Sequence, residues 1–77
     1  MVLDLQQHEL IKMRLRLVGS SLSAIARELD VRATTVTSVS QGYRRSRRIE
    51  QAIAIKLQER PEQLWPDRYS KAAPFRE

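Results

Sequence analysis

The chain has 77 residues, of which 42% are hydrophobic and 30% charged, and this length allows one small domain and excludes a second one. No apolar run approaches the roughly 20 residues that cross a bilayer and no export-signal pattern is present, so we expect a cytoplasmic protein with no membrane partner. The chain has no Cys and 1 His, which excludes disulfides, thiolate catalysis and a structural zinc site.

Positive charge is concentrated in one segment. The 14 Lys and Arg residues exceed the 9 Asp and Glu residues and give a net charge of +5. Residues 31–49 contain arginines but no acidic residue, and the rest of the chain is neutral, so the whole excess lies in that segment. Such a segment is typical of proteins that bind a polyanion, most often nucleic acid and less often a membrane surface or an acidic protein face. The alternative is a solvated basic loop without a partner.

The spacing of apolar residues predicts an all-α fold, a compact bundle of about five short helices. Gly and Pro are scarce, at 2 and 3 residues, and apolar residues recur mostly at intervals of three and four. The first helix is expected over residues 6–18, with a stop at Gly19. Its core-facing residues are Ile11, Leu15 and Val18, with Leu10 and Leu17 beside them.

Two further helices follow after short turns. Leu22–Leu29 is predicted to form an amphipathic helix capped by Ser20 or Ser21. Residues 34–39 are rich in β-branched side chains, which favours a strand. Val36 and Val39 are three residues apart with polar residues between them, however, and this spacing suits a helix. We therefore predict a third helix there, ending at Gln41-Gly42.

The second half of the chain is expected to contain two more helices. A basic connector over residues 43–48 leads into a fourth helix over residues 47–58. Pro61 suits the first turn of a short fifth helix that runs through Leu64, and Pro66 is expected to end it. Residues 1–69 are thus predicted to form a single domain, and residues 70–77 a flexible polar tail.

The second and third helices have the pattern of a helix-turn-helix, in which the second of two short helices enters the major groove of DNA. Asp30 stands in the turn where the chain needs a positive φ and Gly is the usual residue, at a cost of about 1 kcal/mol. Six apolar residues occupy the positions at which the two helices pack against each other: Ile25, Ala26, Leu29, Val31, Val36 and Val39.

Three runs of residues resemble one known family. They are residues 21–27, residues 33–36 and residues 61–69, the last of which contains the signature Leu-Trp-Pro-x-Arg-Tyr. These runs resemble the Ner family of Mu-like phage regulators and their bacterial Ner-like (Nlp) relatives. The resemblance implies a five-helix, λ-repressor-like domain that binds operator DNA and represses early phage transcription. The connector at Tyr43-Arg44-Arg45 is longer than the corresponding loop of that family.

Side chains at the start of the third helix are the candidates for reading bases, because a helix in the major groove presents its N-terminal residues to base edges. These candidates are Arg32, Ala33, Thr34, Thr37 and Ser38. The candidates for phosphate contacts surround this helix: Ser21, Ser23, Thr35, Tyr43, Arg44, Arg45, Arg47 and Arg48. Tyr43 has a second interpretation, which is packing over the end of the third helix.

The sequence therefore predicts a sequence-specific regulator of transcription that binds double-stranded DNA, as a homodimer or as paired monomers. The alternative hypothesis is a helical protein-interaction module that binds an acidic partner. No catalytic, metal-ligand or cofactor-binding arrangement is recognisable, so we expect no enzymatic activity, no metal and no cofactor. Leu64 and Trp65 are expected to pack in the core.

Overall fold

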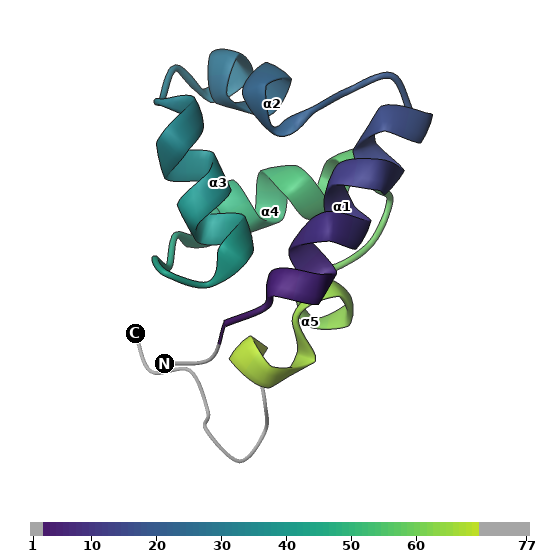
Figure 1. Ribbon diagram of the computed structural model, residues 1–77, viewed down its shortest axis with the longest axis vertical. Coiled ribbons are helices and arrows are strands. Elements are labelled where there is room, and N and C mark those ends of the chain that lie inside the picture. The colour runs from purple at the N-terminus through teal and green to yellow at the C-terminus, as the bar shows by residue number, and fades with distance from the viewer. Residues whose placement is uncertain (1–2, 70–77) are drawn as a thin grey trace.

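A computed structural model describes residues 3–69 and confirms the all-α fold (Figure 1). Its elements are α1 (Leu5–Leu17), α2 (Leu22–Leu29), α3 (Ala33–Gln41), α4 (Arg47–Lys56), α5 (Pro61–Leu64) and a 3₁₀-helix, η1 (Pro66–Tyr69). No strand occurs in residues 3–69. The predicted tail, residues 70–77, lies outside the described residues.

The bounds of the first helix were predicted within one residue at each end. Three apolar residues that were expected in or beside the core are instead exposed. Ile11 and Leu15 are fully buried, as expected. Val18 is instead 55% exposed, because α1 ends at Leu17 and Val18 is the C-cap residue that turns toward Gly19. Leu17 is 77% exposed and Leu10 is 43% exposed. In a bundle this small α1 packs along one side only, so apolar residues on its other side remain in solvent.

The turn between α2 and α3 has the geometry that the sequence predicts. Asp30 is the C-cap of α2 and adopts the left-handed conformation, with φ 59°. Residues 34–39 are helical, which confirms that apolar spacing outweighs β-propensity in this segment. Gly42 ends α3 with φ 100°, a conformation that disfavours any residue with a Cβ atom. Of the six predicted packing residues, Ile25, Ala26, Val36 and Val39 are buried, and Leu29 and Val31 pack against the core while partly buried.

The C-terminal helices begin where expected, and only α4 differs from the prediction at its end. Helix α4 ends at Lys56, two residues earlier than predicted, because Gln58 takes a left-handed conformation with φ 58°. Pro61 is the first residue of α5, as predicted. Pro66 does end α5, but it also begins η1, since a proline fits the first turn of a 3₁₀-helix as well as that of an α-helix.

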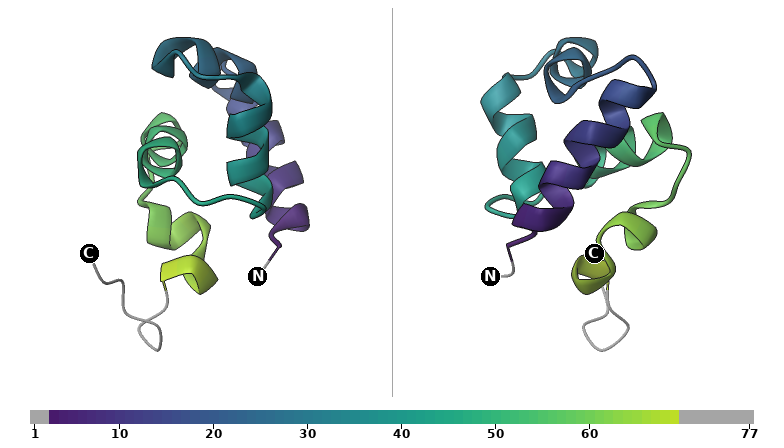
Figure 2. Two further views of the ribbon diagram at one scale, coloured as in Figure 1. Left: turned by 90° about the vertical axis from the view of Figure 1, so that its left-hand side faces the viewer. Right: turned by 45° about the vertical axis from the view of Figure 1, so that its right-hand side comes forward.

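The helices enclose one core. Figure 2 shows α1 and α4 on opposite sides of the molecule, with α2 and α3 at one edge and α5 below them. Trp65 is 1% exposed and Leu64 2% exposed, which confirms both as core residues. None of the helices described is long and apolar enough to cross a membrane. Nor do residues 3–69 contain a group of three or more His, Cys, Asp or Glu side chains that suits a metal ion.

Candidate nucleic-acid interface

Helix α3 presents a polar face to solvent along most of its length. At 100° per residue, Thr34, Thr37 and Ser38 lie on the side opposite Val36 and Val39, which are fully buried. Thr34 is exposed, and Thr37 and Ser38 are partly buried. The structure thus places three of the five predicted base-reading residues on one accessible helix face.

The N-terminal end of α3 is equally open. Arg32 is the N-cap residue and, like Ala33, is exposed. Its guanidinium makes no ion pair or hydrogen bond within residues 3–69. Thr35 points to another side of the helix and is partly buried. The two other predicted base-reading residues therefore lie at the free end of the same helix, and Thr35 lies apart from its exposed face.

A groove joins the start of α2 to the exposed face of α3. Ser21 caps α2, since its Oγ accepts a hydrogen bond of 3.0 Å from the backbone N–H of Ala24. Ser23 is exposed in the first turn of α2 and lines the groove together with Thr37 of α3. Two cations from α1, Lys12 and Arg16, line it as well. Neither cation was among the predicted DNA contacts, because nothing in the linear order indicates that α1 lies beside α2 and α3 at this groove.

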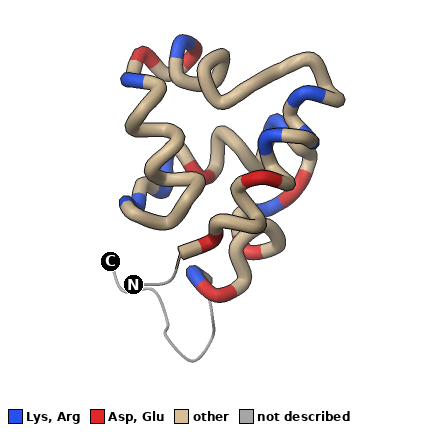
Figure 3. The backbone as a smooth tube through the Cα atoms, in the orientation of Figure 1, with Lys and Arg blue, Asp and Glu red and all other residues tan. Residues whose placement is uncertain are grey.

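The connector after α3 carries the second group of cations. Arg44 is exposed, as is Tyr43, which is 53% exposed and so does not pack closely over α3. The Arg44 side chain makes no ion pair or hydrogen bond within the described part of the chain. Figure 3 shows basic residues before and after α3 on the left-hand side of the molecule, and no acidic residue on α3 itself.

Two of the other connector arginines, Arg45 and Arg48, are bonded to the domain, whereas Arg44 is not bonded within residues 3–69. The Arg45 Nε donates to Oε2 of Glu50 over 2.9 Å, and its guanidinium lies 5.3 Å from the centre of the Tyr69 ring. Arg48 donates to the backbone carbonyl of Leu29 at the end of α2 over 2.8 Å. Arg47 is exposed in the first turn of α4. Arg45 and Arg48 therefore help to fix the connector to the domain, in addition to any contact with a ligand.

Glu50 is a charged core residue that sequence reasoning missed. It is fully buried, and it accepts hydrogen bonds from Arg45, from Arg68 over 3.2 Å and from the hydroxyl of Tyr69. Burial of a carboxylate is unfavourable unless charged and polar groups surround it, and here three groups do so. The only signal in the sequence was the resemblance of residues 64–69 to a family signature, because Arg68 and Tyr69 belong to that signature.

The same network holds the C-terminal end of α3. Arg68 donates to the backbone carbonyl of Ser40 over 2.9 Å and to Asp4 over 2.9 Å, and its guanidinium stacks 4.6 Å from the Trp65 ring centre. The Ser40 hydroxyl is in turn 2.8 Å from Nδ1 of His8. A cation on the last carbonyls of a helix also interacts favourably with the helix dipole. The orientation of α3 is therefore fixed from its buried end.

Two ionisable groups in this network have shifted pKa values. Burial, together with the hydrogen bond to Glu50, raises the pKa of Tyr69 to about 12. Burial and the nearby charge of Lys12 lower the pKa of His8, against a smaller opposite effect of Glu9. Both shifts favour the neutral form of the side chain.

Comparison with known families gives one match. Residues 4–75 match a family model described as winged helix-turn-helix DNA-binding, which is nearly the whole chain. Comparisons with curated proteins and with solved structures find no match. A wing is usually a β-hairpin, but residues 3–69 contain no strand, and α5 and η1 follow the helix-turn-helix and α4 instead.

Proposed function

Because the chain belongs to the family of winged helix-turn-helix DNA-binding domains, we propose that it is a sequence-specific, non-enzymatic regulator of transcription in the bacterial cytoplasm. The observation that carries this proposal is the exposed polar face of α3, which has no acidic residue and is flanked by Arg32 and Arg44, two cations without a hydrogen bond or ion pair among residues 3–69. We further propose that residues 1–69 act as a single domain and that the protein is a Ner-like repressor.

In this proposal α3 lies in the major groove with its N-terminal end toward the bases. Thr34, Thr37 and Ser38 meet base edges through short hydroxyl and methyl groups, beside Ala33. Arg32 is the one long donor at this end of the helix, so it is the candidate for a bidentate contact to guanine. Because the other side chains on this face of α3 are short, they can contact the base edges of only a few base pairs.

Phosphate contacts then supply much of the affinity, from both sides of α3. Arg44, Arg47 and Tyr43 extend from the connector side, with Arg45 and Arg48 held close by through their own protein contacts. Ser21 and Ser23 belong to the other side, where Lys12 and Arg16 add two charges. Thr35 is a further phosphate candidate, in the first turn of α3 but outside this groove. A duplex lying along α3 would thus meet cations on both strands.

The Ner-like assignment is supported by the role of the signature residues in this fold. Trp65 fills the core, and Arg68 and Tyr69 bind Glu50 beneath the end of α3. These signature residues hold the helix that we propose to read DNA. Proteins that share the signature would therefore place this helix on DNA in the same way. Repression, rather than activation, follows from the resemblance alone.

The function is tested by selecting binding sites for the purified protein from random duplexes and then measuring affinity for the selected sequence. We expect one recurring sequence that binds about 10³-fold or more tightly than random DNA, with a strong dependence on salt. Binding that is weak and independent of sequence would contradict the proposal and favour the alternative, a module that holds an acidic protein.

The phosphate assignment is tested by Arg44→Ala. Because one phosphate contact is lost, the slope of log K against log salt should decrease by about one unit, with base preference unchanged. Arg27→Ala is the matched control, since Arg27 is an exposed arginine in the last turn of α2 and is not assigned to DNA. An unchanged slope for Arg44→Ala would contradict a phosphate contact at this position.

A further inference from the structure

Helix α1 has a second apolar face that nothing in the described structure covers. Leu10, Met13 and Leu17 are 43%, 45% and 77% exposed. At 100° per residue they lie within about 60° of one another, on the side of α1 away from the buried Ile11 and Leu15. We call these three residues the outer stripe of α1. Clustered exposed apolar residues on a small protein mark an interaction surface more often than isolated ones do.

The stripe has the spacing of a helix that packs against another helix. Leu10 and Leu17 are seven residues apart with Met13 between them, which is the a–d–a pattern of a coiled-coil seam. Leu3 lies just before the helix begins and is 41% exposed. Gln6, on the same face of the helix, is the only polar residue in this series. The pattern therefore indicates an α-helical occupant.

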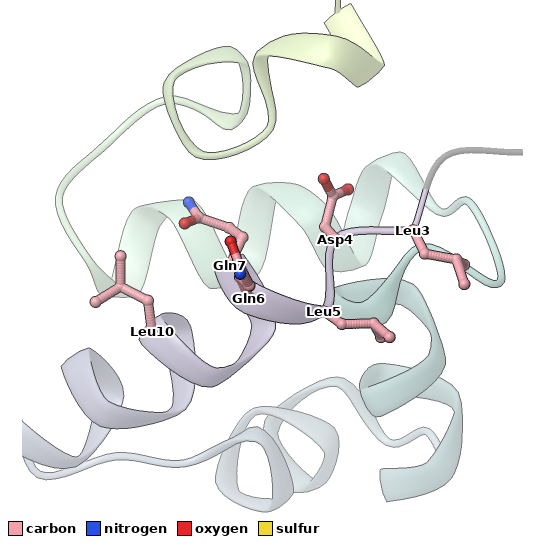
Figure 4. Close-up of a pocket in the computed structure, with 6 residues that line it drawn as sticks. All are labelled: Leu3, Asp4, Leu5, Gln6, Gln7 and Leu10. Atoms are coloured by element: carbon pink, nitrogen blue, oxygen red, sulfur yellow. The ribbon is translucent and has the colours of Figure 1, made fainter.

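The two ends of the stripe differ in form. The N-terminal end is a surface hollow lined by Leu3, Asp4, Leu5, Gln6, Gln7 and Leu10 (Figure 4). The C-terminal end is Leu17, the most exposed large apolar side chain of the described residues. If a second copy of α1 lies antiparallel, centred near Met13, Leu17 of each copy meets the hollow of the other. An interface of this kind closes with two-fold symmetry.

The flanking charges are complementary in the same arrangement. Glu9 and Arg16 border the stripe on one side, seven residues apart, and Glu9 is exposed and bonded only to Lys12 within its own helix, over 3.2 Å. In the antiparallel pair, Glu9 of each copy lies near Arg16 of the other, which gives two attractive pairs. On the opposite border Arg14 is already bonded to Glu59.

We propose that the outer stripe of α1 binds a second copy of this chain, through antiparallel packing of the two α1 helices. His8, whose ring contacts Ser40 of α3, lies on the opposite side of α1 from the stripe, so the dimer leaves both α3 helices accessible. The two surfaces share Arg16, which also lines the groove beside α3, but self-association is measured without DNA, so failure of the dimer and failure of the proposed DNA binding are distinguishable.

The dimer is tested by sedimentation of the purified full chain from about 10 μM to about 1 mM, the range expected for a small interface. The dimer fraction should increase across this range, and Leu17→Glu or Met13→Glu should weaken association at least about tenfold. Ile55→Glu is the matched control, because Ile55 is 74% exposed on α4, and it should associate like the natural chain. Far-UV circular dichroism verifies that each variant is folded.

A charge-exchange experiment tests the antiparallel arrangement itself. Glu9→Arg alone and Arg16→Glu alone should each weaken self-association, because each places like charges opposite each other. A mixture of the two variants should form a heterodimer, since both flanking pairs are then attractive again. The proposal is overturned if the natural chain stays monomeric at the highest concentration, if the mixture does not associate, or if the stripe instead binds anionic lipid vesicles as a monomer.

Discussion

The two ends of α3 differ in their exposure to solvent and in the bonds that they make to the rest of the domain. The N-terminal end, with Arg32 and Thr34, is exposed, and these two side chains make no hydrogen bond or ion pair within residues 3–69. The C-terminal end is bound through its backbone by Arg68 and through Ser40 by His8, both of them buried. One end is thus available to a ligand, and the other fixes the direction in which the helix points. This difference indicates which substitutions affect stability and which affect recognition.

The largest expected effect lies at the buried end. Glu50→Ala removes the acceptor that holds Arg45, Arg68 and Tyr69, and it leaves the buried Arg68 guanidinium with only one of its two carboxylate partners, Asp4. The free energy of unfolding, measured in urea, should decrease by about 3–5 kcal/mol, a large part of the stability of a domain this size. Glu62→Ala, at an exposed site, is the control. A decrease in stability below about 1 kcal/mol would show that the network is not essential.

At the exposed end we expect the opposite pattern. Thr34→Ala should change the free energy of unfolding by no more than about 0.5 kcal/mol, because Thr34 is exposed and makes no side-chain hydrogen bond within residues 3–69. It should change the preference at one base-pair position by about 1–3 kcal/mol, measured on a panel of single-base variants of the selected site. Uniform weakening on all sequences would instead assign Thr34 to phosphate.

A smaller effect is expected in the turn that precedes α3. Asp30 holds φ 59°, which Gly adopts more readily. Asp30→Gly should therefore stabilise the protein by up to about 1 kcal/mol in urea unfolding, partly offset by the greater freedom of Gly in the unfolded chain. A clear loss of stability would indicate that the Asp30 side chain contributes an interaction outside its backbone conformation.

The smallest expected effect is a pH dependence at the buried end. Burial lowers the pKa of His8 in the folded state. Below pH 6.5 the imidazole is therefore protonated more readily in the unfolded chain than in the folded protein. Stability should accordingly decrease as the pH falls below 6.5, and less so in His8→Gln. Urea unfolding of both proteins from about pH 7.5 to about pH 5.5 measures the difference. Parallel curves would contradict burial of a neutral His8.

The order of the helices followed from sequence because it depends on local patterns. The Val36–Val39 spacing, the caps at Ser21 and Gly42, and Pro61 at a first turn are each decided within a few residues of the chain. The helix-turn-helix followed from the same signals. These features can be predicted without knowing which helices pack against each other.

Features that depend on tertiary contacts did not follow. In the sequence Glu50 has the pattern of an exposed charge on a helix, but the connector brings Arg45 to it and η1 brings Arg68 and Tyr69. The outward-facing Leu17 was assigned beside the core, because α1 has apolar residues on both faces and periodicity does not tell which face is covered. The base-reading and phosphate roles remain predictions.

The central claim is that the exposed end of α3 reads DNA while the buried network only holds the helix. The direct measurement compares the base-preference profiles of the natural chain, Arg32→Ala and Tyr69→Phe on one panel of duplexes. We expect Arg32→Ala to lose preference at one G·C position, and Tyr69→Phe to keep the whole profile with at most a uniform loss of affinity. A profile altered by Tyr69→Phe and unchanged by Arg32→Ala would contradict the account.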